Sequence, residues 1–172
     1  MKAIYITGFM GAGKTSIGDK LAEALNVQVI DTDHYIEQKV GEKIAAIFSK
    51  HGEQKFRAYE QEFLKELPTT DIVVTTGGGI ITQAENRNWM KQHGKIIYLH
   101  CEIELIFERL KDDTTRPLFD VQQREKTIQL FHERLPLYRE ADFIVDTTFK
   151  NIDQIIHEII EWLDFKKGGN ND

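Results

Sequence analysis

The chain has 172 residues, of which 41% are hydrophobic and 29% are charged, and its 22 basic and 28 acidic side chains give a net charge of −6. This size and composition are those of one ordinary globular domain. The acidic balance argues against a general nucleic-acid-binding protein, and the apolar runs are too short to cross a membrane. A single cysteine, Cys101, excludes an intramolecular disulfide. Because the chain begins with a strand-like run rather than a basic and then apolar leader, we expect a cytoplasmic protein.

Strand-like and helical patterns alternate along the chain. The expected strands are 3–7, 27–30, 71–75, 95–100 and 143–146. The expected helices are 17–25, 34–66 with breaks at Gly41 and Gly52, 82–92, 102–110, 125–139 and 152–163. This alternation predicts an α/β fold, a three-layer sandwich with a central five-stranded parallel sheet. We expect residues 1–165 to form a single domain and residues 166–172 to form a polar C-terminal tail. Ligands of such sheets bind beyond the carboxyl ends of the strands.

The first loop at that edge, Gly8–Thr15, matches the phosphate-loop pattern G-x4-G-K-[ST] between a strand and a helix. Its glycines allow a tight turn whose N–H groups face an anion at the start of a helix. Lys14 adds a charge for the β- and γ-phosphates, and the Thr15 hydroxyl is placed to ligate Mg²⁺. The sequence therefore predicts a nucleotide site. Its expected ATP contacts in the loop are Gly11, Ala12, Gly13, Lys14, Thr15 and Ser16.

The class of phosphate-loop protein depends on where the acidic residues lie. The guanine-reading N-K-x-D and the switch D-x-x-G are absent from the sequence, and the third strand ends in threonines and glycine instead of an acid. A metal carboxylate then has to come from Asp31-Thr32-Asp33, after the second strand. Alternation would place Asp31 and Asp33 on one side of an extended segment. One could hold Mg²⁺ and the other accept a proton from a substrate hydroxyl. Alternatively, these acids cap the following helix.

Further motifs follow the phosphate loop in a fixed order. They are Gly18, Leu21, Ala22, Leu25, Asp31-Thr32-Asp33, Ile44, Ile47-Phe48, Gly52-Glu53, Phe56-Arg57, Glu60, Gly77-Gly78-Gly79, Arg109, Arg116-Pro117-Leu118, Arg134, Pro136, Leu137 and Tyr138. In this order and at these spacings, over most of its length, the chain resembles the shikimate kinases, within the nucleoside-monophosphate-kinase-like fold. The resemblance implies transfer of the γ-phosphoryl of ATP to the 3-hydroxyl of shikimate, giving 3-phosphoshikimate on the route to aromatic amino acids. It also implies one Mg²⁺ ion and a monomer.

The resemblance assigns roles to particular residues. Arg57 and Arg134 match the arginines that bind the shikimate carboxylate, for which a planar guanidinium is well suited. Glu60, one helical turn from Arg57, can hold that arginine in place; without the family pattern, the two would read as an exposed helix pair. Asp33 matches the catalytic carboxylate at the reacting hydroxyl. The other implied substrate-binding residues are Gly78, Gly79, Phe48 and Phe56, in a substrate-binding helical segment over about 33–61.

On the nucleotide side, the resemblance assigns Thr15 and Asp31 to the metal and Arg109 to the adenine ring. Residues 111–124 match a mobile lid that carries the catalytic, ATP-binding Arg116. Lys150 is a further ATP-binding candidate, although the family often has an arginine and a proline where Lys150-Asn151-Ile152 stands here. Two alternatives stay open. One is another small-molecule phosphate-loop kinase, such as a gluconate kinase or a nucleoside-monophosphate kinase. The other is a non-catalytic nucleotide-binding regulator.

Overall fold

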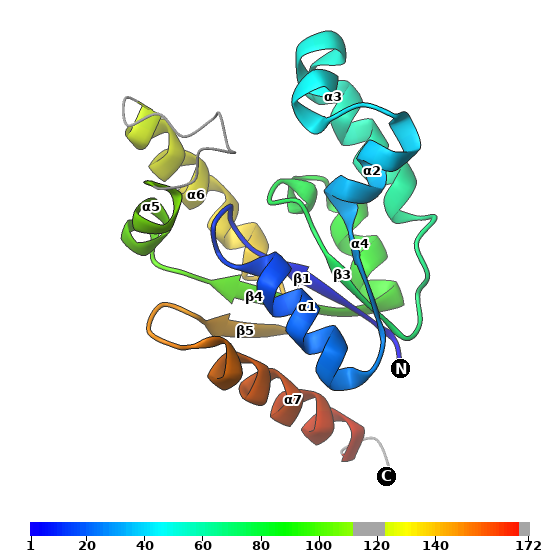
Figure 1. The fold of residues 1–172 in the computed structure, drawn as a ribbon, viewed down its shortest axis with the longest axis vertical. Coiled ribbons are helices and arrows are strands. Elements are labelled where there is room, and N and C mark those ends of the chain that lie inside the picture. The colour runs from blue at the N-terminus through cyan, green and yellow to red at the C-terminus, as the bar shows by residue number, and fades with distance from the viewer. Residues whose placement is uncertain (112–122, 169–172) are drawn as a thin grey trace.

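The sheet organises the protein. In the computed structural model, which describes residues 1–111 and 123–168, the strands are β1 (Ala3–Thr7), β2 (Gln28–Asp31), β3 (Ile72–Thr75), β4 (Gly94–His100) and β5 (Phe143–Asp146). They form a parallel sheet in the order β2-β3-β1-β4-β5 (Figure 1). Ile4 in the central strand pairs with Val73 on one side and with Lys95 on the other. The predicted five-stranded parallel sheet is confirmed.

Helices cover both faces of this sheet (Figure 1). They are α1 (Lys14–Leu25), α2 (Thr32–Val40), α3 (Ile44–Leu64), the 3₁₀ helix η1 (Ile80–Thr82), α4 (Ala84–His93), α5 (Ile103–Lys111), α6 (Arg124–Tyr138) and α7 (Ile152–Gly168). Helices α1 and α7 pack together on one face, and α4 packs against β4 on the other. The helix expected over 82–92 starts two residues later because η1 precedes it. Helix α7 continues to Gly168, so the expected polar tail is partly helical.

The main core lies around the central strands. All residues of β1 and β3 are buried, as expected for strands covered on both faces. A second, smaller core of Ile36, Ile47 and Phe56 lies between α2 and α3. Gly52 interrupts α3 with a φ of 81°, a backbone conformation that favours glycine, which confirms the break expected there. The α2–α3 pair is therefore an arm with its own packing.

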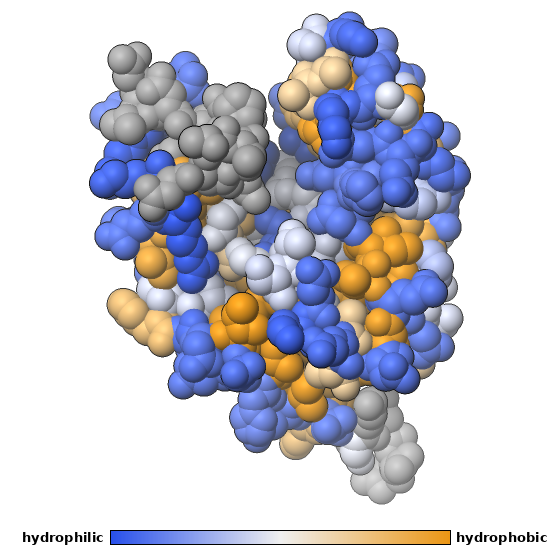
Figure 2. All heavy atoms as spheres, viewed as in Figure 1, coloured by the Kyte–Doolittle hydropathy of each residue, from blue (hydrophilic) through white to orange (hydrophobic). Residues whose placement is uncertain are grey.

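Two helical arms extend beyond the carboxyl ends of the strands. The α2–α3 pair stands on the β2 side of the sheet, and α5 and α6 stand on the other side (Figure 1). The surface is hollowed between the two arms (Figure 2). The predicted phosphate loop follows the central strand β1, at the edge of the sheet beyond which both arms extend (Figure 1). None of the helices within residues 1–111 and 123–168 is both long and apolar enough to span a membrane.

Candidate active site

The phosphate loop joins β1 to α1. Gly13 caps α1 in a left-handed conformation, with φ 91° and ψ 21°, and brings no side chain onto the first-turn N–H groups. Such groups are available to an anion. The Lys14 ammonium donates to the carbonyl of Gly8 at 2.7 Å and to that of Phe9 at 3.0 Å, so it lies along the loop itself. Arg109 of α5 donates to the Gly11 carbonyl at 3.2 Å, which places this predicted ATP-binding residue beside the loop.

Asp31 is the N-cap of α2. One carboxylate oxygen accepts from the backbone N–H of His34 at 3.0 Å, and the other accepts from the Thr75 hydroxyl at 2.8 Å. The capping alternative is therefore correct for Asp31. The expectation that Asp31 and Asp33 share one side of an extended segment is wrong, because α2 begins at Thr32 and Asp33 lies in its first turn. The two carboxylates still interact, since the charge of Asp31 raises the pKa of Asp33.

Asp33 is a partly buried residue whose Oδ1 atom is itself buried and has no hydrogen-bond partner among the described residues. Burial and the charge of Asp31 raise its pKa to about 6, while Lys14 and Arg57 oppose this shift. The phosphate-loop lysine and the predicted substrate-binding arginine thus both act on this carboxyl group. Buried polar atoms in native proteins are normally satisfied. An orphaned acceptor that is ionised at neutral pH is suited to receive a hydrogen bond or a proton from a substrate hydroxyl.

Arg57 is held between two acids on α3. Its guanidinium contacts Glu60 Oε1 at 2.6 Å and Glu53 Oε1 at 3.2 Å, and the Glu60 side chain is fully buried. The expected one-turn pairing with Glu60 is confirmed. Burial raises the pKa of Glu60 to about 7 in spite of the opposing charge of Arg57. Burial lowers and the two carboxylates raise the pKa of Arg57, with a net rise. Arg57 therefore stays cationic.

The two predicted aromatic residues lie next to Arg57 on α3. The rings of Phe48 and Phe56 are 4.8 Å apart, and the Arg57 guanidinium carbon is 5.3 Å from the Phe56 ring centroid. Phe56 is buried in the arm, whereas Phe48 is 37% exposed. Phe48 is therefore the one of the two that presents an apolar surface outside the core.

Arg134 approaches from the opposite arm. Its guanidinium carbon lies 5.9 Å from the Phe9 ring centroid, and its Nε is buried without a hydrogen-bond partner among the described residues. A β-carbon on Gly78 would stand 3.5 Å from Arg134 Nη1. Arg134 also acts electrostatically on Glu60 and Tyr138. The structure therefore brings Arg57 and Arg134 to adjacent glycines, Gly79 and Gly78, from opposite arms.

A cleft of about 560 Å³ lies between these arms. Its walls come from α3, from the end of η1 with the residue that follows it, and from α6. The lining residues are Glu53, Gln54, Arg57, Thr82, Gln83, Leu130, Glu133, Arg134 and Leu137. A cleft of this size accommodates a small molecule. Arg57 and Arg134 bring two guanidinium groups to it, beside the carboxylates of Glu53 and Glu133, and a guanidinium suits an anionic ligand.

Gly77 belongs to the predicted glycine run but was not predicted as a site contact. A β-carbon there would stand 2.6 Å from Asp33 Oδ1 and 3.2 Å from Glu60 Oε2. Its adjacency to Gly78 and Gly79 could have indicated it. Glu53 was also missed, although it lies four residues before Arg57, a spacing that pairs side chains on a helix. Tyr138 has the same spacing from Arg134 and donates to the Gly78 carbonyl.

Two predicted ATP-binding residues stand apart from this arrangement. The Lys150 ammonium pairs with Glu158 of α7 at 2.6 Å, so its charge is directed at that helix. Arg116 and most of the expected lid lie outside the described residues.

The predicted metal ligands are chemically suited to Mg²⁺, which prefers oxygen ligands and retains waters and phosphate oxygens. Thr15 offers a hydroxyl in the first turn of α1, and the Asp31 carboxylate oxygens each keep acceptor capacity beyond their single hydrogen bonds. No three acidic, histidine or cysteine side chains form a metal cage within the part of the chain that the structure describes. An ion bound largely by phosphates and water needs no such cage.

Comparisons with known proteins show the family of the chain. Residues 10–164 match the shikimate kinase family model. A shikimate kinase of Bacillus cytotoxicus is 51% identical over 160 residues, or 93% of this chain and 97% of that one. The structure of an Acinetobacter baumannii shikimate kinase in complex with shikimate has a TM-score of 0.89 and 40% identity, covering 97% of this chain and 95% of that one. A gluconokinase from Sinorhizobium meliloti, with a TM-score of 0.58 and 16% identity, shares only the fold. The chain belongs to the shikimate kinase family.

Proposed function

We propose that the chain transfers the γ-phosphoryl of ATP to the 3-hydroxyl of shikimate, giving 3-phosphoshikimate and ADP. One observation carries this proposal. Arg57 approaches Gly79 and Arg134 approaches the adjacent Gly78 from the opposite arm, and the Asp33 carboxylate, whose Oδ1 lacks a hydrogen-bond partner among the described residues, interacts electrostatically with Arg57 and with Lys14 of the phosphate loop. An acceptor with a carboxylate at one end and a hydroxyl at the other fits this pattern of charge.

The proposed mechanism relies on positioning and electrostatics, which supply most of the catalysis in phosphoryl transfer. Arg57 and Arg134 bind the shikimate carboxylate, while Glu60 and Glu53 fix the orientation of Arg57. The 3-hydroxyl then donates to Asp33 Oδ1, which accepts its proton as the phosphoryl group is transferred. The glycine backbone forms one wall of the site, with Gly78 and Gly79 as contacts. Phe48 and Phe56 close the apolar side of the shikimate ring.

ATP binds on the phosphate loop in this proposal. The N–H groups of Gly11 to Ser16 surround its phosphates, and Lys14 leaves the Gly8 and Phe9 carbonyls to neutralise the β- and γ-phosphates. Arg109 packs on the adenine ring, and Lys150 and Arg116 complete the contacts. Thr15 and Asp31 would hold one Mg²⁺ ion, which supplies charge neutralisation at the transferred group.

The test is ADP release from Mg·ATP with and without shikimate, with quinate, gluconate and AMP as control acceptors. We expect turnover that depends on shikimate and exceeds that with every control. Turnover with gluconate or AMP instead would overturn the assignment of the acceptor. ATP binding without turnover on any acceptor would point to a non-catalytic regulator. Chelation of divalent metal should abolish the reaction, and added Mg²⁺ should restore it.

The proposal also includes a monomeric enzyme that works in the cytoplasm without nucleic-acid or membrane partners. The net charge of −6 supports the absence of a nucleic-acid partner. Size-exclusion chromatography with light scattering tests the oligomeric state. A mass near 20.0 kDa is expected for the monomer, and a mass of twice that value would contradict it.

A further inference from the structure

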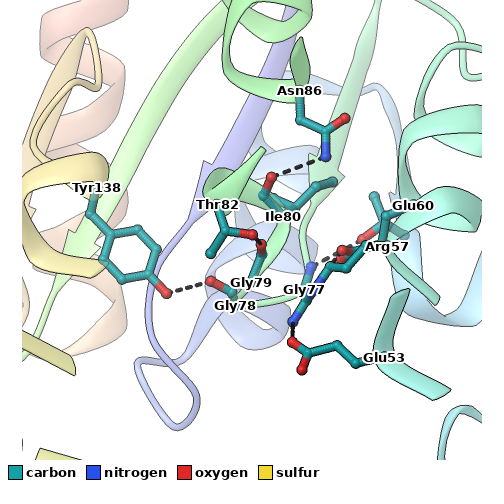
Figure 3. Close-up of polar contacts among 11 residues, drawn as sticks. Glu53, Arg57, Glu60, Gly77, Gly78, Gly79, Ile80, Thr82, Asn86 and Tyr138 are labelled. Carbon is teal, nitrogen blue, oxygen red and sulfur yellow. Dashed lines mark hydrogen bonds and ion pairs between the residues drawn. The ribbon is translucent and has the colours of Figure 1, made fainter. Parts of the chain in front are cut away.

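The glycine run, Gly77–Gly79, is held by hydroxyl groups from three different elements. The N–H of its first glycine donates to Thr32 Oγ1 of α2 at 3.0 Å. The carbonyl of its second glycine accepts from the Tyr138 hydroxyl of α6 at 2.5 Å, and the carbonyl of its third accepts from the Thr82 hydroxyl at 2.7 Å. Figure 3 shows the last two bonds. Each of the three glycines therefore has one backbone group bonded to a hydroxyl, which restricts a segment that would otherwise have large backbone freedom.

Tyr138 is the most deeply buried of these anchors. Its side chain is buried, and its ring stacks on that of Tyr98, with centroids 4.9 Å apart and planes 8° from parallel. The Tyr98 hydroxyl bonds in turn to His100 Nδ1 at 3.0 Å. Burial raises the pKa of Tyr138 to about 12, so its phenol keeps its proton and donates at neutral pH. Arg134 lies one turn earlier on the same helix.

This hydrogen bond fixes the direction of a second group. The carbonyl of Gly78 and the N–H of Gly79 belong to one planar trans peptide, so they point in opposite directions. Because the carbonyl is directed at Tyr138, the Gly79 N–H points away from α6. Figure 3 shows Tyr138 on one side of the glycine run and Arg57 on the other. Among the described residues, no acceptor takes the Gly79 N–H, so it is a donor available to a ligand.

We propose that Tyr138 is a positioning residue for the acceptor substrate. Its hydroxyl turns the Gly78–Gly79 peptide so that the Gly79 N–H, next to the Arg57 guanidinium, donates to an anionic or hydroxylated acceptor. This inference rests on the proposed function for the identity of the acceptor. Without the hydroxyl, the unrestrained glycines would sample other peptide orientations, and the donor would be lost for part of the time.

The kinetic test compares Tyr138→Phe with Tyr98→Phe. Both variants remove one buried phenolic oxygen from the same stacked pair, but only the first removes the bond to the glycine run. We expect Tyr138→Phe to raise the KM for shikimate by about three- to tenfold, the effect of one hydrogen bond. The KM for ATP should change by less than about twofold. Tyr98→Phe should leave both values near those of the wild type. Equal changes in both KM values, no change in either, or matching effects of the two variants would overturn the proposal.

A second measurement needs no substrate. Backbone ¹⁵N relaxation of labelled protein should show a lower order parameter for the Gly79 N–H in Tyr138→Phe, with the values in β1 and β3 unchanged. Tyr98→Phe should leave Gly79 at the wild-type value. An unchanged order parameter at Gly79 in Tyr138→Phe would refute the positioning role even if wild-type turnover with shikimate is established. Conversely, absent turnover in the wild type with a lower Gly79 order parameter in the variant would count against the proposed acceptor and leave the anchoring intact.

Discussion

The carboxylate of Asp33 lies against the bare α-carbon of Gly77, where a β-carbon would stand 2.6 Å from Asp33 Oδ1. The backbone of Gly77 has no left-handed φ that would itself demand glycine. The requirement at this position is therefore space for a neighbouring side chain. Gly79 shows the same relationship with Arg57, whose guanidinium occupies the place of a β-carbon, whereas the nearest atom to such a carbon on Gly78 is 3.5 Å away.

These distances predict an order of effects for alanine substitutions in the glycine run. Gly77→Ala should displace Asp33 and lower kcat by about 10²-fold, the lower end of a lost acid–base group. Gly79→Ala should displace Arg57 and mainly raise the KM for shikimate. Gly78→Ala should have the smallest effect of the three, because its β-carbon makes only ordinary contacts. Steady-state kinetics of the three variants measure this order.

Gly168→Ala is the matched control, since a β-carbon there meets nothing within 4 Å. It should leave the kinetics unchanged. Equal losses in all three variants of the glycine run would contradict the steric explanation and indicate that any substitution distorts the whole segment.

Arg57 provides a second prediction. Arg57→Ala should raise the KM for shikimate by about 10²-fold, as expected when a charge pair loses one partner, and leave the KM for ATP nearly unchanged. It also leaves the buried Glu60 without its cation, so the melting temperature should fall. Arg57→Lys keeps a charge for Glu60 but lacks the planar fork, so it should fold well and still bind shikimate weakly.

Lys55→Ala is the control for charge on the same helix, because the Lys55 ammonium lies 4.8 Å from the Tyr59 ring centroid rather than in the cleft. Its kinetics should match those of the wild type. If Arg57→Ala raised both KM values to the same extent, the carboxylate clamp would be refuted.

The parts of the molecule that sequence predicted are those set by local patterns. The phosphate loop needs a fixed run of residue types, and the buried strands β1 and β3 are largely apolar segments. The loop and the two strands can therefore be predicted without knowledge of tertiary contacts. The extended conformation expected for Asp31-Thr32-Asp33 was wrong because a residue between a strand and a helix can either extend the strand or cap the helix. The bond from the Thr75 hydroxyl, 44 positions away, is part of what fixes the orientation of its carboxylate.

The remaining site features come from contacts between distant segments. Asp33 Oδ1 lies against Gly77 without a hydrogen-bond partner because α2 begins at Thr32. Neither the start of the helix nor the contact with Gly77 follows from the spacing of residues in the sequence. Tyr138 and Gly78 are 60 positions apart, so their hydrogen bond has no local signature. Similarly, the pairing of Lys150 with Glu158 depends on how the loop before α7 folds back on that helix. Residue types could be named from the sequence, but not the partners that orient them.

The raised pKa of Asp33 predicts a pH dependence of catalysis. With a pKa of about 6, the carboxylate is ionised above neutral pH and loses its capacity as a proton acceptor below pH 6. The value of kcat/KM for shikimate should therefore be level above about pH 7 and fall about tenfold per pH unit below about pH 6. ATP affinity, measured by equilibrium binding without acceptor, should vary much less over the same range. A level kcat/KM between pH 5 and pH 8 would contradict the requirement for ionised Asp33.

The same pKa predicts that Asp33→Asn stabilises the protein at neutral pH. The carboxyl group releases its proton near pH 3.8 when unperturbed but only at about 6 in the folded state. Between these values the folded protein binds more protons than the unfolded chain, so stability falls as pH rises through this window and stays lower above it. The cost at pH 8 is on the order of 3 kcal/mol. Asparagine avoids this cost, so the melting temperature of Asp33→Asn should exceed that of the wild type by several degrees at pH 8 and by almost nothing at pH 4.

The control is Asp19→Asn, because Asp19 is exposed on α1. The difference in melting temperature between this variant and the wild type should not grow with pH. Because Asp33→Asn should also lose activity, a gain in stability at pH 8 would identify Asp33 as a residue kept for catalysis at the expense of stability. A variant less stable than the wild type at pH 8 would show that the ionised carboxylate contributes to the fold instead.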